Sequence, residues 1–269
     1  MPIAFLGTSD FAAAILAALA ATDDLRPALV VTRPDRPSGR GRRLASPPVA
    51  VAARGLGLAL TQPAKIGDEP ARAEIARAVD GGIVVVSAFG ALIREPLLSE
   101  HEILNVHPSL LPRWRGAAPI ERAIMAGDAE TGVSIMRLTA GLDSGPVCLE
   151  GVEPIHVGDT YGTLATRLED LGATLLIRAL REHPACREQD EAGVTYAEKI
   201  GPEDRLLDPA RPAVELERVV RALHPHIGAR VALPDGTHLG VDAAAVVTDA
   251  PDTRSAHGAG AVSYTHLTL

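Results

Sequence analysis

The sequence has few of the residues that mark several common classes of protein. Only two cysteines, Cys148 and Cys186, occur in 269 residues, too few for a disulfide framework, which predicts a reducing, cytoplasmic setting. Aromatic residues make up 3% of the chain, which argues against an RNA-binding surface built from exposed rings. No apolar run approaches the roughly 18 residues of a membrane span, and the first residues lack the basic segment of a secretory signal.

Lysine is also scarce, and the basic residues are unevenly placed. The chain has two lysines among its 26 basic residues, and its formal net charge of −8 argues against a general nucleic-acid coat. Residues 33–43, however, contain five arginines and only one acidic residue, Asp35. A concentrated positive loop on an acidic protein suits local phosphate recognition, although a solvated basic loop would have the same composition.

The length and the hydrophobic pattern predict a large α/β domain followed by a smaller one. A chain of 269 residues that is 46% hydrophobic can bury a large core and leave room for a second, small domain. Short apolar runs predict strands at residues 2–6, 28–32, 82–87, 102–107, 133–137 and 146–152. Helical patterns predict helices that begin after the capping residues Ser9 or Asp10, Ser46 and Asp159, and further helices at residues 69–78 and 120–126. Strands that alternate with helices in this way indicate an open, mostly parallel sheet.

Ligands of open parallel sheets bind beyond the carboxyl ends of the strands. Here that rule points to residues 7–9, 87–90 and 105–107. The turn after the first strand has a single glycine and no Gly-x-Gly-x-x-Gly pattern, and the chain has no Walker lysine motif. Neither a dinucleotide site nor a phosphate-binding loop of the Walker type is therefore predicted.

The second part of the chain is predicted to be less compact. Residues 184–205 are mostly polar and are interpreted as a linker. Within residues 206–248 we predict a helix at 214–223 and a β-hairpin around Pro234-Asp235-Gly236, which indicates a small β-rich domain. Residues 249–269 have little apolar content, and no regular structure is predicted for them.

Asn105, His107 and Asp143 are the residues that most suggest chemistry. On a strand, positions i and i+2 leave the same face, so Asn105 and His107 would point to one reacting centre. Asp143 lies in a glycine-bracketed loop from which its carboxylate can orient an imidazole. This set suits attack on a carbonyl, although a hydrogen-bonded histidine before a proline and a turn aspartate have the same spacing. No metal site is predicted, because the histidines show no ligand spacing and the two cysteines are isolated in the sequence.

The stretch from Asn105 to Ile120, NVHPSLLPRWRGAAPI, resembles the signature of the folate-dependent formyltransferases. Four further blocks agree with that family in order, namely residues 5–12, 34–43, 127–136 and 196–200. The resemblance covers roughly residues 1–245. It implies a Rossmann-like α/β formyltransferase domain at 1–183, followed by a linker and an OB-like barrel that also holds tRNA.

The resemblance also implies roles for individual residues. Asn105, His107 and Asp143 fall on the catalytic positions of the family. The folate-binding segment falls on Ser109, Leu110, Leu111 and Pro112, and the surroundings of the pterin pocket fall on Ser87, Ala88, Phe89, Gly90 and Leu142. The loop that enters the acceptor stem of initiator tRNA falls on Arg36, Arg40, Arg42 and Arg43.

The activity that the resemblance implies is transfer of a formyl group from 10-formyltetrahydrofolate to the α-amine of methionine on initiator tRNA. The expected partners are initiator methionyl-tRNA and the folate, with no metal, no DNA and no membrane, and the expected state is a cytoplasmic monomer. Two alternatives stay open: a formyltransferase that acts on a small amine such as a nucleotide or amino sugar, and a folate- or RNA-binding module without turnover.

The C-terminal end departs from the family pattern. Residues 206–269 are short for the barrel of the family, and residues 261–269 do not resemble its last strands. We therefore expect an incomplete second domain with exposed strand edges and weakened tRNA binding, next to a sound catalytic domain.

Overall fold

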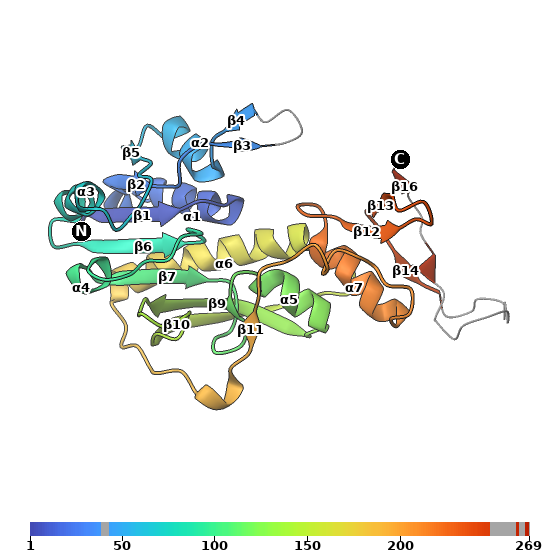
Figure 1. The fold of residues 1–269 in the computed structure, drawn as a ribbon. Helices are drawn as coiled ribbons and strands as arrows, with labels where there is room; N and C mark the ends of the chain where they lie inside the picture. Colours follow the sequence, from blue (N-terminus) through green and yellow to red (C-terminus); the bar gives the residue numbers. More distant parts are fainter. Residues whose placement is uncertain (39–42, 248–261, 264–266, 269) are drawn as a thin grey trace.

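A computed structural model describes residues 1–38, 43–247, 262–263 and 267–268. Its centre is a seven-stranded sheet in the order β10-β9-β7-β6-β1-β2-β5 (Figure 1). The strands are β1 (Ile3–Gly7), β2 (Leu29–Val31), β5 (Leu60–Thr61), β6 (Ile83–Ser87), β7 (Ile103–His107), β9 (Glu130–Arg137) and β10 (Val147–Pro154). Only β9 runs against the others, so the predicted open, mostly parallel sheet is confirmed.

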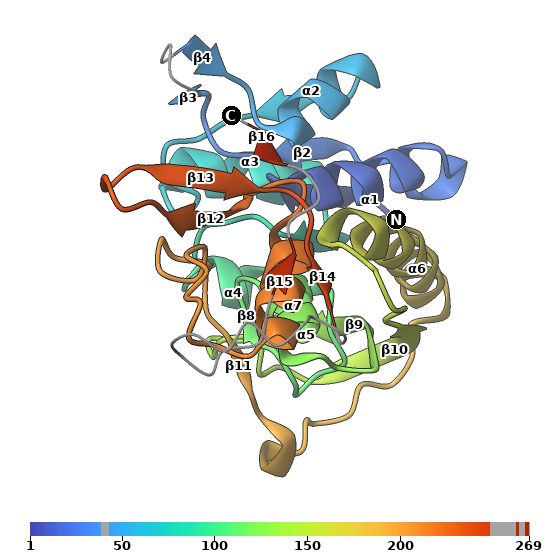
Figure 2. The ribbon, with the colours of Figure 1, turned by 90° about the vertical axis from the view of Figure 1, so that its right-hand side faces the viewer.

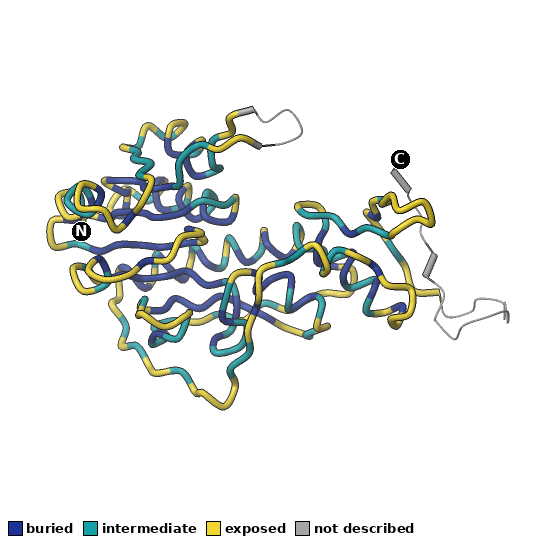
Figure 3. Tube along the Cα trace, in the orientation of Figure 1, coloured by how far each residue is buried: buried dark blue, intermediate teal, exposed yellow. Residues whose placement is uncertain are grey.

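The central strands are buried on both faces because their sequences are continuous apolar runs (Figure 3). Alternate residues of each strand enter two different cores: Ile3 and Phe5 of β1 pack on one face, and Ala4 and Leu6 pack on the other. The first core is covered mainly by α1 (Asp10–Ala20), α2 (Pro48–Gly55), α5 (Pro119–Ala126) and α6 (Tyr161–Glu182). The second is covered by α3 (Glu69–Val79) and α4 (Leu97–Glu100).

The helix starts differ from the predicted ones at two positions. Ser9 caps α1 as predicted, since its hydroxyl accepts from the N–H of Ala12. Ser46 does not cap α2, because its hydroxyl donates instead to a carboxylate oxygen of Asp35 at 2.8 Å. At α6 the cap is Thr160, and the Asp159 carboxylate is occupied by Arg167 at 2.7 Å. In both cases a side chain 8 to 11 positions away engages the expected capping group.

The segment that follows α6 lies along the edge strand β10. The N–H and C=O groups of Val147 and Arg187 bond each other, and a disulfide joins Cys148 to Cys186. The prediction of two isolated cysteines is therefore wrong. The pairing of Val147 with Arg187 brings the neighbouring cysteines together, although they are 38 positions apart in the sequence. Such a contact leaves no local pattern in the sequence.

The C-terminal part consists of α7 (Ala213–Leu223) and short strands beyond it (Figures 1 and 2). Strands β12 (Ala229–Ala232) and β13 (His238–Val241) form the predicted hairpin, and β13 also pairs with β16 (Leu267–Thr268). β14 (Ala245–Val246) pairs with β15 (Val262–Ser263). Apolar residues of α7, β12 and β13 form a separate small core that also contacts Met125 of α5. Among the described residues, no helix is long and apolar enough to cross a membrane.

Candidate active site

Asn105 and His107 lie at the carboxyl end of β7, where it is flanked by β6 and β9. Leu104 and Val106 enter the core beneath α1 and α6, so Asn105 and His107 face the other side of the sheet, as the i, i+2 spacing predicts. Both polar side chains are buried, with 7% and 4% of their surfaces exposed. Burial of an amide and an imidazole costs free energy unless both side chains have hydrogen-bond partners. The carboxyl end of β7 therefore differs from the apolar core around it.

The His107 ring is held between a carbonyl and a carboxylate. Its Nε2 lies 2.9 Å from the carbonyl oxygen of Trp114, and because a carbonyl only accepts, Nε2 is the nitrogen that carries a proton. Its Nδ1 lies 3.6 Å from Oδ2 of Asp143, so a protonated ring forms an ion pair there. The predicted His107–Asp143 pair is thus present in the structure.

Asp143 stands in the loop between β9 and β10, with a left-handed backbone at φ 44°. Its Oδ2 accepts the N–H of Gly116 at 2.9 Å. Gly116 belongs to β8 (Arg115–Gly116), which pairs with β11 (Tyr196–Ala197) of the linker. The backbone of Gly116 has a φ of 127°, and a Cβ atom at this position would lie 2.6 Å from the Ala197 carbonyl oxygen. The close contact between β8 and β11 therefore requires glycine here.

Sequence reasoning missed one residue of the site. Gln189, in the segment interpreted as a linker, donates from Nε2 to the carbonyl oxygens of Asp143 and Gly145 at 2.8 and 2.7 Å. No motif marked it, because its partners lie more than 40 positions away in the sequence.

The loop 87–90 follows β6 and lies next to Asn105, since Val86 and Asn105 are partners in the sheet. Thr8 anchors this loop by donating to the carbonyl oxygen of Phe89 at 2.6 Å. The Ser87 hydroxyl is fully buried and has no hydrogen-bond partner in the described part of the chain. Leu142 is 57% exposed beside Asp143. This end of the sheet therefore has one buried hydroxyl without a partner in the described part of the chain and one exposed apolar side chain.

The side chains of Ser109 and Leu111, in the segment Ser109–Pro112, mainly contact other groups of the protein. The Ser109 hydroxyl is fully buried and donates to the Arg113 carbonyl oxygen, while Ser134 donates to the Ser109 carbonyl oxygen and accepts from the N–H of Leu111. Leu111 is buried against Met136 and Val147. Leu110 lines a cavity of about 250 Å³.

Two of the four predicted tRNA-binding arginines, Arg36 and Arg43, lie in a pair of short strands remote from this centre in the sequence. Arg36 is exposed in β3 (Arg36–Ser38), which pairs with β4 (Arg43–Ala45). Arg43 is the first residue of β4, and Arg40 and Arg42 lie outside the described residues.

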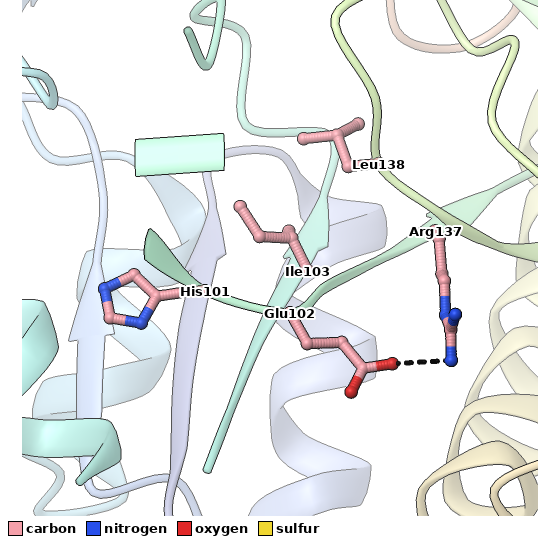
Figure 4. Close-up of a pocket in the computed structure, with 5 residues that line it drawn as sticks. All are labelled: His101, Glu102, Ile103, Arg137 and Leu138. Carbon is pink, nitrogen blue, oxygen red and sulfur yellow. Dashed lines mark ion pairs between the residues drawn. The ribbon is translucent and has the colours of Figure 1, made fainter. Parts of the chain in front are cut away.

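A second cavity, of about 300 Å³, lies at the other end of β7 (Figure 4). His101, Glu102, Ile103, Arg137 and Leu138 line it, and Arg137 pairs with Glu102 at 3.1 Å. The His101 ring points away from that pair (Figure 4). The cavity sits at the amino end of the strand and does not contain the Asn105–His107–Asp143 set. Among the described residues, no three acidic, histidine or cysteine side chains are grouped to hold a metal ion.

The fold and this site define a class: α/β proteins in which an amide, an imidazole and a carboxylate meet at one strand end, a set that suits attack on a carbonyl. Residues 1–180 match the family model for formyl transferase. A methionyl-tRNA formyltransferase from Halorhodospira halophila is 46% identical over 259 residues, covering 94% of this chain and 82% of the relative. The chain therefore belongs to the formyl transferase family, with the methionyl-tRNA formyltransferases among its relatives.

Solved structures share the fold at lower identity. A sugar N-formyltransferase from Shewanella superposes with a TM-score of 0.67 at 16% identity, covering 90% of this chain and 96% of that one. An N-formyltransferase from Helicobacter canadensis, solved with folinic acid and dTDP-3-aminofucose, has a TM-score of 0.66 at 14% identity and covers 92% and 88%. These likenesses establish the formyltransferase fold.

Proposed function

We propose that the chain transfers a formyl group from 10-formyltetrahydrofolate to the α-amine of methionine on initiator methionyl-tRNA. The observation that carries the proposal is the convergence of Asn105, His107 and Asp143 at the carboxyl end of β7, in a chain 46% identical to a methionyl-tRNA formyltransferase. Two further features support it: folinic acid bound by a structural neighbour, and the basic hairpin β3–β4.

The folate donor supplies the formyl group when bound. We assign its pterin end to Ser87, Ala88, Phe89, Gly90 and Leu142, and its approach to Ser109, Leu110, Leu111 and Pro112. The exposed Leu142 side chain can contact a pterin ring directly, and Leu110 lines a cavity, whereas the Ser87 side chain is fully buried and acts through the shape of its loop. The Ser109 and Leu111 side chains act through the shape of their loop, because both are buried.

The residues of the site have separate tasks in the transfer. The amine nitrogen bonds to the formyl carbon, the bond from that carbon to the folate nitrogen breaks, and the amine loses a proton. The Asn105 amide and the protonated His107 ring stabilise the negative charge that develops on the formyl oxygen. Asp143 holds His107 in position and, through a water molecule, assists removal of the amine proton.

We assign residues 1–183 to the catalytic domain, 184–205 to the linker, 206–248 to a partial OB-like domain and 249–269 to a tail. Arg36, Arg40, Arg42 and Arg43 would contact the acceptor stem of the tRNA. The expected monomeric state stays a prediction.

Acid gel electrophoresis of charged tRNA tests the function directly. Purified protein is incubated with 10-formyltetrahydrofolate and methionine-charged initiator tRNA, with charged elongator methionine tRNA as the matched control. Formylation of the initiator species is expected. Formylation of an amino sugar nucleotide and of neither tRNA would favour the small-amine alternative. Folate binding without turnover on any acceptor would favour the non-catalytic alternative.

A further inference from the structure

Gln189 connects the linker to the loop that carries Asp143. Its Nε2 donates to the carbonyl oxygens of Asp143 and Gly145 at 2.8 and 2.7 Å. Its Oε1 accepts two hydrogen bonds from Arg115, from Nε at 3.0 Å and from Nη2 at 2.8 Å. All the hydrogen-bonding capacity of this amide is therefore used: both donors bind the catalytic loop, and the oxygen binds the guanidinium.

Arg115 fixes the position of this amide. Its side chain is only 4% exposed, and Nη2 also donates to Glu191 at 3.0 Å. Its backbone N–H bonds the Thr195 carbonyl oxygen at 2.9 Å. The next residue, Gly116, donates to the Asp143 carboxylate. Asp143 is thus held at its carboxylate by β8 and at its carbonyl by the linker that pairs with β8.

These contacts hold the backbone of Asp143 in a sparsely populated conformation. At φ 44° it lies in the left-handed region, which few non-glycine residues occupy and which aspartate enters more readily than most. Two carbonyls turned toward one amide keep the loop in that conformation, with Oδ2 beside His107. A carboxylate in place of the amide would still accept from Arg115, but it would set negative oxygens against two carbonyl oxygens.

We propose that Gln189 is a positioning residue that sets Asp143 against His107, so that the linker is part of the active centre. The proposal rests on the proposed function of Asp143 and extends it to a residue outside the catalytic domain. The side chain need not touch either substrate, since it acts only through the Asp143 loop.

The test compares Gln189→Glu, which keeps the size of the side chain and removes both donors, with Glu188→Gln at the exposed neighbouring position. For Gln189→Glu, kcat is expected to fall roughly 10- to 100-fold, as for a misplaced catalytic group, with KM for tRNA and folate affinity unchanged. Glu188→Gln should keep wild-type kcat. Wild-type kcat in Gln189→Glu would overturn the proposal.

A double-mutant cycle separates positioning from a general structural effect. In an Asp143→Asn background, Gln189→Glu should lower kcat little further, because both changes disable the same group. An equal loss in both backgrounds would overturn the proposal and show that Gln189 merely stabilises the linker.

A readout independent of turnover keeps this test distinct from that of the proposed function. Hydrogen exchange at residues 143–145 is expected to accelerate in Gln189→Glu and not in Glu188→Gln. If wild-type protein fails to formylate tRNA, the proposed function fails while this measurement still decides the proposal. Unchanged exchange in Gln189→Glu would overturn it.

Discussion

The catalytic centre and the basic hairpin β3–β4 are built in opposite ways. In the centre, Asn105 and His107 are buried at a strand end, and Asp143 is held by contacts from β8 and the linker. In the hairpin, two three-residue strands carry an exposed Arg36. The two proposed functions have different structural requirements. Stabilising charge on one oxygen needs fixed donors, whereas attracting a polyanion needs only charge near its path.

The base of the hairpin is nevertheless ordered by one carboxylate. Gln62 donates to Asp35 Oδ1 at 2.7 Å and to the Arg33 carbonyl oxygen at 2.9 Å, and Ser46 donates to Asp35 Oδ2. Arg54 in turn donates to Ser46 and Gln62. The hairpin therefore leaves the domain from a defined position.

The largest effect is expected at Asn105. Asn105→Ala removes one donor to the developing oxyanion, which should lower kcat about 10²- to 10³-fold and leave KM for tRNA unchanged. Steady-state formylation at varied tRNA concentration measures both constants. His101→Gln, just before the other end of the same strand, is the matched control and should keep wild-type kcat. Near-normal turnover of Asn105→Ala would remove Asn105 from the mechanism.

A smaller and different effect is expected in the hairpin. Replacing Arg36, Arg40, Arg42 and Arg43 by glutamine should raise KM for tRNA and leave kcat and folate affinity unchanged. The dependence of log kcat/KM on log salt should flatten by about 0.7–0.9 for each tRNA phosphate that the variant no longer neutralises. Exposed arginines of α6, Arg178 and Arg181, provide the charge control. A parallel loss of folate affinity would show that the hairpin shapes the folate site instead.

Sequence patterns predicted most of the scaffold that carries these two regions. Continuous apolar runs marked β1, β6 and β7, because strands buried on both faces leave that local pattern. The i, i+2 spacing placed Asn105 and His107 on one face, since strand geometry is local.

The inferences that failed are those in which another side chain engages the expected group. Ser46 and Asp159 have the composition of helix caps, but Asp35 and Arg167, 11 and 8 positions away, engage them instead. The same limit hid Gln189 and the Cys148–Cys186 disulfide, whose partners meet only through tertiary pairing. The resemblance to a family identified Asp143, which spacing alone left open.

The smallest effect is expected at the base of the hairpin, and it separates placement of charge from amount of charge. The hydrogen bond from Gln62 and, to a smaller extent, the one from Ser46 lower the pKa of Asp35, so this carboxylate is ionised at neutral pH. Asp35→Ala leaves both donors without their acceptor and frees the hairpin base. KM for tRNA should rise by a small factor, on the order of two to five, because the placement of the arginines is loosened. Loss of the Asp35 charge would by itself lower KM, so a rise in KM reports the change in placement.

The salt dependence tells the two hairpin variants apart. In Asp35→Ala the slope of log kcat/KM against log salt should stay at its wild-type value, since the same arginines still neutralise the same phosphates. Removal of the arginines should flatten this slope. Asp35→Asn keeps one acceptor oxygen and should lie between Asp35→Ala and wild type. A fall in kcat would contradict the separation of the two regions and point to Arg33, which donates to the Gly90 carbonyl oxygen at 3.2 Å. Through that bond a loosened hairpin base would disturb the loop next to Asn105, and the two regions would act as one.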